Sequence, residues 1–213
     1  MAIDERNGDR MDTNAFRYCT YGLVILGASQ DGKINGMVNN TFIQVTNTPS
    51  RVTVALTKSG LTHDMILDMG HFAASILTDA APFSVFQHFG FQSGRDSRKF
   101  ENIPHALDAQ GMPYLVENVC ARFSCAVERS IDLGTHTLFV ARVADAAVLS
   151  ASSAPMSYAV YQTQVKPQSK PQSKGFSCDL CGYVLHADSV PADFVCPICG
   201  HDASHFVPLG AGK

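Results

Sequence analysis

The sequence of 213 residues predicts a mainly β body, built as an antiparallel barrel or sandwich, followed by a small cysteine-rich module. Strand-like apolar segments dominate the body, its helix-like segments are short, and the two types do not alternate regularly. Paired cysteines occur only in the C-terminal part. A body of about 150 residues can bury roughly 68–70% of the surface that its unfolded chain exposes, which is enough for a core of its own.

The first strand of the body is expected in the continuous apolar run at 21–28. This run is followed by Asp31-Gly32 and Asn35-Gly36, two dipeptides that favour tight turns because their residues tolerate positive φ. The sequence therefore predicts a turn at each dipeptide.

The next elements are a strand and two short helices. Residues 51–57 alternate between apolar and polar side chains, which is the pattern of a strand with one buried face. A helix is expected over 59–70, opened by a Ser or Thr cap and closed by Gly70. A second helix is expected to start at Pro82 and to end near Gly90, since proline suits a first turn and glycine a stop. Further strands are expected at residues 71–78, 115–129 and 137–149.

The two ends of the body differ from it in composition. The motif Lys166-Pro-Gln-Ser recurs as Lys170-Pro-Gln-Ser, a polar repeat with nothing to bury, which predicts a linker. As a flexible coil this linker would average about 20 Å, and fully extended about 40 Å. We expect a disordered N-terminal extension at 1–12, a body at 13–162, the Lys/Pro/Gln/Ser linker at 163–174 and the cysteine-rich domain at 175–213.

Composition excludes several classes of protein. Apolar residues make up 46% of the chain, which excludes wholesale disorder. The net charge of −3 and the pI near 6.2 argue against a nucleic-acid binder, which normally carries a basic face. The apolar runs are far shorter than the ~20 residues of a membrane span, and the N-terminus has no apolar signal region. We therefore expect a cytoplasmic protein with neither nucleic-acid nor membrane partners.

Two Cys-x-x-Cys pairs predict a metal site. Four thiolates in this arrangement can surround one tetrahedral ion, and Gly182 and Gly200 follow the two pairs, where the chelating loop needs an unusual backbone conformation. A module of this size needs a metal in order to fold. Residue types alone do not separate iron from zinc, and a structural zinc ribbon stays open. The predicted ligands are Cys178, Cys181, Cys196 and Cys199.

Other motifs in the body are weak or absent. The run from Gly27 to Lys33 fits a P-loop pattern, but Ile34 stands where magnesium needs a hydroxyl, and no helix is expected to follow. No G-x-G-x-x-G follows a predicted strand, so a Rossmann fold is unsupported. The remaining cysteines, Cys19, Cys120 and Cys125, are expected to be buried small hydrophobes, with a redox or ligand role as the alternative.

Three polar segments of the body are candidates for binding. Residues 35–45 present amides and a hydroxyl that suit a planar heterocycle. Residues 57–63 and 92–96 combine hydroxyls, backbone amides and a cation, as a phosphate cradle does. Taken singly, each segment is better explained by caps, turns and solvated charges than by a binding site.

These segments together resemble a known family. The runs Asn35-Gly-Met-x-x-Asn-Thr-Phe-x-Gln-Val-Thr, Leu61-Thr-His-Asp, His88-Phe-Gly-Phe-x-Ser-Gly-Arg-Asp and Gly134-Thr-His-Thr-Leu-Phe are similar to those of the flavin reductase-like family, which are FMN-binding split β-barrels of Greek-key type. The resemblance covers roughly residues 13–162. The tail, with Cys-Asp-Leu-Cys-Gly-Tyr and Cys-Pro-Ile-Cys-Gly, resembles the rubredoxin-like domain of rubrerythrins. The whole chain resembles the high-molecular-weight rubredoxins of anaerobes.

The resemblance also implies site residues. By resemblance, the residues that contact the isoalloxazine region of FMN are Asn40, Thr41 and Gln44. The residues implied to bind the ribityl phosphate are Lys58, Ser59, Thr62 and His63. Supplementary phosphate contacts are implied for Ser93, Gly94 and Arg95. His136 is the candidate catalytic residue, which would place the nicotinamide near the flavin.

The implied activity is NAD(P)H oxidation in a homodimer that holds FMN and one rubredoxin-type iron. A nicotinamide gives two electrons as a hydride, a tetrathiolate iron accepts one, and a flavin handles both, so the two domains together make a converter. The resemblance implies onward transfer to a redox protein, such as a flavodiiron oxygen or nitric oxide reductase. The alternative is a flavin reductase that delivers reduced FMN, with the tail as a zinc-binding docking module.

Overall fold

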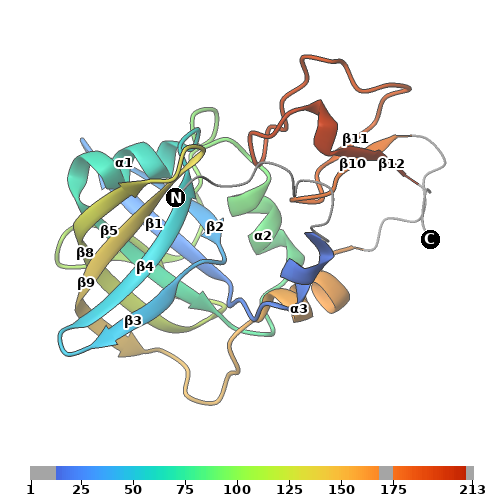
Figure 1. The fold of residues 1–213 in the computed structure, drawn as a ribbon. Helices are drawn as coiled ribbons and strands as arrows, with labels where there is room; N and C mark the ends of the chain where they lie inside the picture. Colours follow the sequence, from blue (N-terminus) through green and yellow to red (C-terminus); the bar gives the residue numbers. More distant parts are fainter. Residues whose placement is uncertain (1–12, 168–174, 210–213) are drawn as a thin grey trace, which may run out of the picture.

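The computed structural model describes residues 13–167 and 175–209. The expected extension at 1–12 and residues 168–174 of the expected linker lie outside this part of the chain. As predicted, the body is mainly β (Figure 1). Seven antiparallel strands form one sheet in the order β2-β1-β5-β8-β9-β4-β3. They are β1 (Val24–Gln30), β2 (Lys33–Asn39), β3 (Ile43–Asn47), β4 (Ser50–Thr57), β5 (His71–Leu77), β8 (Val119–Asp132) and β9 (His136–Val148).

Smaller elements complete the body. Its helices are α1 (Leu61–Met69), α2 (Phe83–Gly90) and α3 (Tyr158–Val160), which continues as a wider helical turn over Tyr161–Val165. A 3₁₀ turn (Thr13–Tyr18) precedes the sheet, and β6 (His105–Leu107) and β7 (Pro113–Leu115) form a short ribbon. No helix in the described ranges is both long and apolar enough to cross a membrane.

The sheet closes into a split barrel through side chains. At the end of β2, the Asn39 side-chain amide donates a hydrogen bond to the Ala55 carbonyl of β4, at 2.9 Å. The Thr41 hydroxyl donates to the same carbonyl at 3.1 Å, and the Ala55 amide donates to the Thr41 hydroxyl at 2.8 Å. These bonds satisfy the Ala55 backbone groups at the seam, where a continuous ladder would otherwise be needed.

Two apolar clusters lie on opposite faces of the sheet. Val24, Leu26 and Ala28 of β1 point into the barrel, where Met65 and Ile66 of α1 join them. Alternate residues of the same stretch point outward and pack beneath α2 and α3, together with Phe86, Phe89 and Tyr161. Because successive side chains of a β-strand point to opposite faces of the sheet, this one stretch contributes residues to both apolar clusters.

Most predicted elements are confirmed, and three predictions are wrong. Asn35-Gly36 lies within β2, and the turn is at Asp31-Gly32, where both φ angles are positive. Gly36 is required instead by close packing, because a Cβ there would lie 2.9 Å from the Leu26 carbonyl oxygen. α1 begins after Gly60 with no side-chain cap, and Cys19 is exposed rather than buried.

The tail is a three-stranded sheet around its cysteines. Its strands, in the order β11-β10-β12, are β10 (Phe176–Cys178), β11 (Val184–Leu185) and β12 (Phe206–Pro208). Buried Cys178 and Cys196 pack with Phe206, and the Phe194 ring meets Phe206 edge-on at 5.1 Å. A core this small, built on sulfur atoms, depends on a metal for its stability.

Candidate active site and metal centre

A cavity of about 540 Å³ lies at the barrel wall beside the tail. The end of β2, the start of α1 and the segment that follows α2 form its barrel side. A volume of this size suits a cofactor or a drug-sized ligand. The tail contributes residues of both cysteine pairs to the same cavity.

Asn35 is a polar residue of this cavity whose side-chain oxygen has no hydrogen-bond partner among the described residues. It is buried, and its side-chain amide donates to the Thr62 hydroxyl at 3.0 Å. The unpartnered oxygen, Oδ1, is itself buried. A buried acceptor without a donor is costly, so the cavity suits a ligand that brings an N–H group, as a flavin ring does.

Gly94 is required by the position of Asn35. A Cβ at residue 94 would lie 2.2 Å from the Asn35 side-chain nitrogen and 2.5 Å from its oxygen. The segment after α2 therefore packs directly onto the Asn35 amide. Any larger residue at 94 would displace that amide.

The N-terminus of α1 suits a phosphate. Its first residues line the cavity, and Gly60, the N-cap, provides no side chain to bond the first amides. Free amides and the helix dipole at this end favour an anion. Together with the Asn35 acceptor and the cavity volume, this set of donors fits a flavin nucleotide.

The structure brings five of the ten predicted flavin residues to this cavity, together with the predicted catalytic residue. Those that line it are Asn40, Ser59, Thr62, Ser93, Gly94 and His136. Among the others, Thr41 forms the barrel seam and Gln44 lies on the exposed edge strand β3, where its amide donates to the Asn47 side chain at 2.8 Å.

The remaining predicted residues form polar pairs close to the cavity. The Lys58 ammonium lies 2.6 Å from Asp132, and buried His63 shares a 2.8 Å hydrogen bond with the Thr137 hydroxyl. Arg95 donates to Asp64 at 2.7 Å. Burial alone would raise the pKa of Asp64, but the hydrogen bonds from His63 and Arg95 outweigh it and lower that pKa. These three pairs position the loops around the cavity.

Sequence reasoning included Asn35 in the candidate binding segment 35–45 and also in a predicted turn, but it did not single out Asn35 as a site residue. It also missed Lys99, which no motif distinguishes from a surface lysine. Lys99 lines the cavity, is only 4% exposed, and donates to the Phe89 carbonyl at 2.9 Å. No ion pair joins it to a carboxylate within 13–167 and 175–209. Burial lowers the pKa of Lys99 to about 8.

We expect Lys99 to make the flavin-free protein more stable as the pH rises from about 8 to 10.4, whereas the Cys125 thiol, whose pKa burial raises to about 12, acts in the opposite direction above about pH 9. In this window the unfolded chain still holds the Lys99 proton, since a free lysine has a pKa of about 10.4, whereas the folded chain has lost it. The gain is on the order of 3 kcal/mol in the free energy of unfolding. In urea titrations the wild type should gain this stability relative to Lys99→Met across the window, whereas Lys33→Met, at an exposed position, should follow the wild type. Equal slopes for Lys99→Met and the wild type would contradict this role.

The four predicted metal ligands converge in the tail. Their sulfur atoms all lie within 4.8 Å of one another, and the Cys178–Cys199 and Cys181–Cys196 distances are 3.7 and 3.5 Å. Thiolates at about 2.3 Å from one tetrahedral ion are spaced about 3.8 Å apart, so the set fits a single ion. Burial raises the pKa values of the Cys181 and Cys199 thiols, so metal binding must displace their protons.

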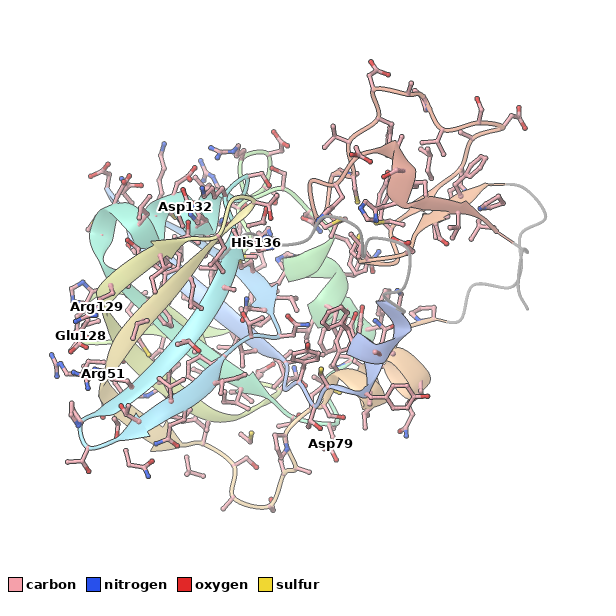
Figure 2. All side chains as sticks on the ribbon, in the orientation of Figure 1. Arg51, Asp79, Glu128, Arg129, Asp132 and His136 are labelled. Carbon is pink, nitrogen blue, oxygen red and sulfur yellow. The ribbon has the colours of Figure 1, made fainter. Side chains whose placement is uncertain are left out.

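The tail places one side of this site against the cavity. Cys181 and Cys199 line it together with Tyr183, Pro197 and Ile198. His136 lies on the side of the barrel that faces the tail, whereas Arg51 and Glu128 lie on the opposite side (Figure 2). Burial, and then the nearby His201 of the tail, lower the pKa of His136.

Comparison with known proteins agrees with this arrangement. Residues 16–166 match the model of the flavin reductase like domain, and residues 176–207 match the rubredoxin-like domain of rubrerythrin. A high molecular weight rubredoxin of Moorella thermoacetica is 35% identical, over 89% of this chain and 96% of its own length. A ferric-chelate reductase (NAD(P)H) of Archaeoglobus fulgidus is 32% identical, over 73% of this chain and 92% of its own length.

A solved structure supports the fold of the body. The styrene monooxygenase flavin reductase of Pseudomonas putida S12 aligns with a TM-score of 0.61 at 26% identity, covering 70% of this chain and 93% of that one. The predicted flavin and iron fit both domain families. The chain therefore belongs to the flavin reductase-like family, as an oxidoreductase and flavoprotein whose C-terminal domain is of the rubredoxin-like type.

Proposed function

We propose that this protein is an NAD(P)H-linked electron-transfer protein that passes electrons from FMN in the barrel to iron in the tail, and from there to a separate redox protein. The observation that carries the proposal is the shared cavity: Cys181 and Cys199 line the same space as Asn40 and Ser59. A flavodiiron oxygen or nitric oxide reductase is the proposed class of acceptor. We further propose a cytoplasmic homodimer.

The residues of the barrel would hold the cofactor by complementary hydrogen bonding. Asn35 offers an unpaired acceptor, and Asn40 adds a second amide at the cavity wall. The α1 amides with Ser59 and Thr62 would bind the phosphate, and the Lys99 ammonium would balance negative charge on the cofactor. FMN held by these residues would supply the chemistry that joins a two-electron hydride donor to a one-electron acceptor such as tetrathiolate iron.

His136 would position the nicotinamide. It lines the cavity, and its ring shares a 2.8 Å hydrogen bond with the Thr135 hydroxyl. Because its pKa is lowered, the ring is neutral at pH 7 and adds no charge that would oppose transfer of a hydride. We expect His136→Ala to raise the KM for NADH roughly tenfold, about 1.4 kcal/mol, with little change in FMN affinity.

Steady-state kinetics together with FMN titration of the apoprotein would check this expectation. His71→Ala is a suitable control, because His71 lies on β5 and its side chain hydrogen-bonds only the nearby Met69 carbonyl among the described residues. A fall in FMN affinity with an unchanged KM for NADH would assign His136 to the flavin site instead.

A second candidate function is delivery of reduced flavin to another enzyme, with the tail as a zinc-binding docking module. It is favoured by an NADH-dependent flavin reductase of Pseudomonas fluorescens, which is 31% identical over 62% of this chain. In that case FMN should exchange freely and the tail should take no electrons.

Metal analysis and an absorption spectrum of the same purified sample distinguish the two functions. The electron-transfer proposal predicts a retained flavin, about one iron per chain, and bleaching of both chromophores by NADH or NADPH. A colourless zinc-bound tail and a flavin lost on gel filtration would favour the second function.

A further inference from the structure

The four-cysteine site has one open side, and this side faces the barrel. Cys178 and Cys196 are 2% and 1% exposed and pack in the core of the tail. Cys181 and Cys199 are partly exposed, and only this pair of ligands lines the barrel cavity. We call this pair the open edge of the metal site.

Other contacts hold the open edge in place. Pro197, Ile198 and Tyr183 line the cavity beside the two cysteines. Lys166, at the end of the helical segment that follows the barrel, places its ammonium 3.0 Å from the point where a Cβ on Gly182 would lie. In Figure 1, α2 lies between the barrel and the tail, in line with its Phe86, Phe89 and Gly90 lining this cavity. The open edge is therefore part of a docking surface.

We propose that docking of the tail on the barrel hides the edge of the metal site that an external redox protein must approach, so that the tail receives electrons when docked and delivers them when undocked. This inference rests on the proposed function. Electron transfer weakens steeply with distance, and the buried ligands Cys178 and Cys196 offer no comparable route to the surface of the tail. Electron transfer from the flavin to the metal and electron transfer from the metal to an external redox protein therefore both require the open edge, and they cannot occur at the same time.

The number of electrons that each centre carries determines how often the tail must dock. Oxidation of one NAD(P)H to NAD(P)⁺ releases two electrons and one proton, with the hydride taken up by FMN. A tetrathiolate iron changes between Fe³⁺ and Fe²⁺, so it carries one electron at a time. The tail must therefore dock twice for each NAD(P)H, and must undock twice to reduce two one-electron acceptors.

The two cysteine pairs provide a matched set of variants. Ile198 and Leu180 each precede the second cysteine of their pair, and they are 36% and 40% exposed. Ile198 lines the cavity, whereas Leu180 does not. Ile198→Asp should weaken docking about tenfold, because it removes an apolar contact with the cavity and places there a carboxylate that loses part of its hydration when the tail docks. Leu180→Asp adds the same charge to the same module away from the barrel.

The first test measures docking itself, and it works with either iron or zinc in the tail. In small-angle X-ray scattering of the full chain, Ile198→Asp should increase the radius of gyration, and Leu180→Asp should leave it unchanged. Equal radii for the wild type and both variants would overturn the docking surface.

The second test measures delivery. The full chain is reduced with dithionite and mixed with cytochrome c as a protein-sized one-electron oxidant, with Cys181→Ser as the background for direct transfer from the flavin. In the wild type and in Leu180→Asp, the rate should reach a plateau as cytochrome c increases, since undocking becomes limiting. In Ile198→Asp it should exceed that plateau and rise in proportion to cytochrome c.

A linear rate of equal size in all three proteins would overturn the inference, because the edge would then be open in the docked state. This outcome is distinguishable from failure of the proposed function. In that failure NADH would leave the iron of the wild type oxidised, whereas the dithionite experiment requires no NADH and the scattering experiment requires no iron.

Discussion

Replacing Cys181 with serine is expected to abolish the thiolate-to-iron absorption of the tail while FMN reduction by NADH continues at a rate within about twofold of the wild type. The Cys181 sulfur lies 3.5 Å from that of Cys196 in the four-sulfur cluster, so its loss leaves three ligands. The small core of the tail is built around buried Cys178 and Cys196, so loss of the metal should also unfold the tail. The barrel has two cores of its own and should remain folded.

Absorption spectra, iron analysis and stopped-flow FMN reduction would check this expectation. Cys19→Ser is the control, because Cys19 is exposed and lies outside the four-sulfur cluster. Loss of FMN reduction in Cys181→Ser, with normal behaviour of Cys19→Ser, would show that the barrel depends on the tail and would contradict two separate centres.

Gly94→Ala is expected to raise the dissociation constant of FMN by roughly 10- to 100-fold, or about 1.4–2.7 kcal/mol. The added methyl group would lie 2.2 Å from the Asn35 side-chain nitrogen, so the amide or the loop must move. Movement breaks the 3.0 Å hydrogen bond to Thr62 and displaces the buried acceptor that the flavin would satisfy. The crowding should also lower stability by about 1–3 kcal/mol.

Fluorescence titration of the apoprotein with FMN and urea unfolding would measure the two effects. Gly60→Ala is the matched control, because Gly60 lines the same cavity but a Cβ there would meet its nearest neighbour at 3.6 Å, an ordinary contact. We expect Gly60→Ala to change FMN affinity by no more than about threefold, a few tenths of a kcal/mol. Similar losses in both variants would contradict the specific role of Asn35.

The strands of the barrel were predictable where one face is buried. Val52, Val54 and Leu56 alternate in the sequence and are all buried in β4. The prediction of a turn at Asn35-Gly36 was wrong because an Asn-Gly pair occurs both in turns and in strands where a neighbour packs closely on the glycine. Here Gly36 packs against the Leu26 carbonyl and the Phe100 ring, and this contact cannot be inferred from the dipeptide alone. The edge strand β3 was not predicted, since its five residues are all exposed and carry no burial pattern.

The convergence of the four cysteines was predictable because they are close in sequence and chemically distinctive, and their sulfur atoms lie within 4.8 Å of one another. The cavity was harder to predict from the sequence, because it is formed by segments that lie far apart in the chain. Lys99 reaches it through the fold of the segment after α2, and its burial leaves no mark in the sequence. The approach of Cys181 and Cys199 to the barrel depends on how two domains pack, which neither motif specifies.

Anaerobic stopped-flow spectroscopy with excess NADH would show whether electrons pass from flavin to iron within one chain. We expect the flavin absorption to bleach first and the iron absorption to follow with a rate that does not depend on protein concentration. An iron rate that increases in proportion to protein concentration would place the transfer between molecules, and iron that stays oxidised after the flavin is reduced would show that the two centres do not communicate.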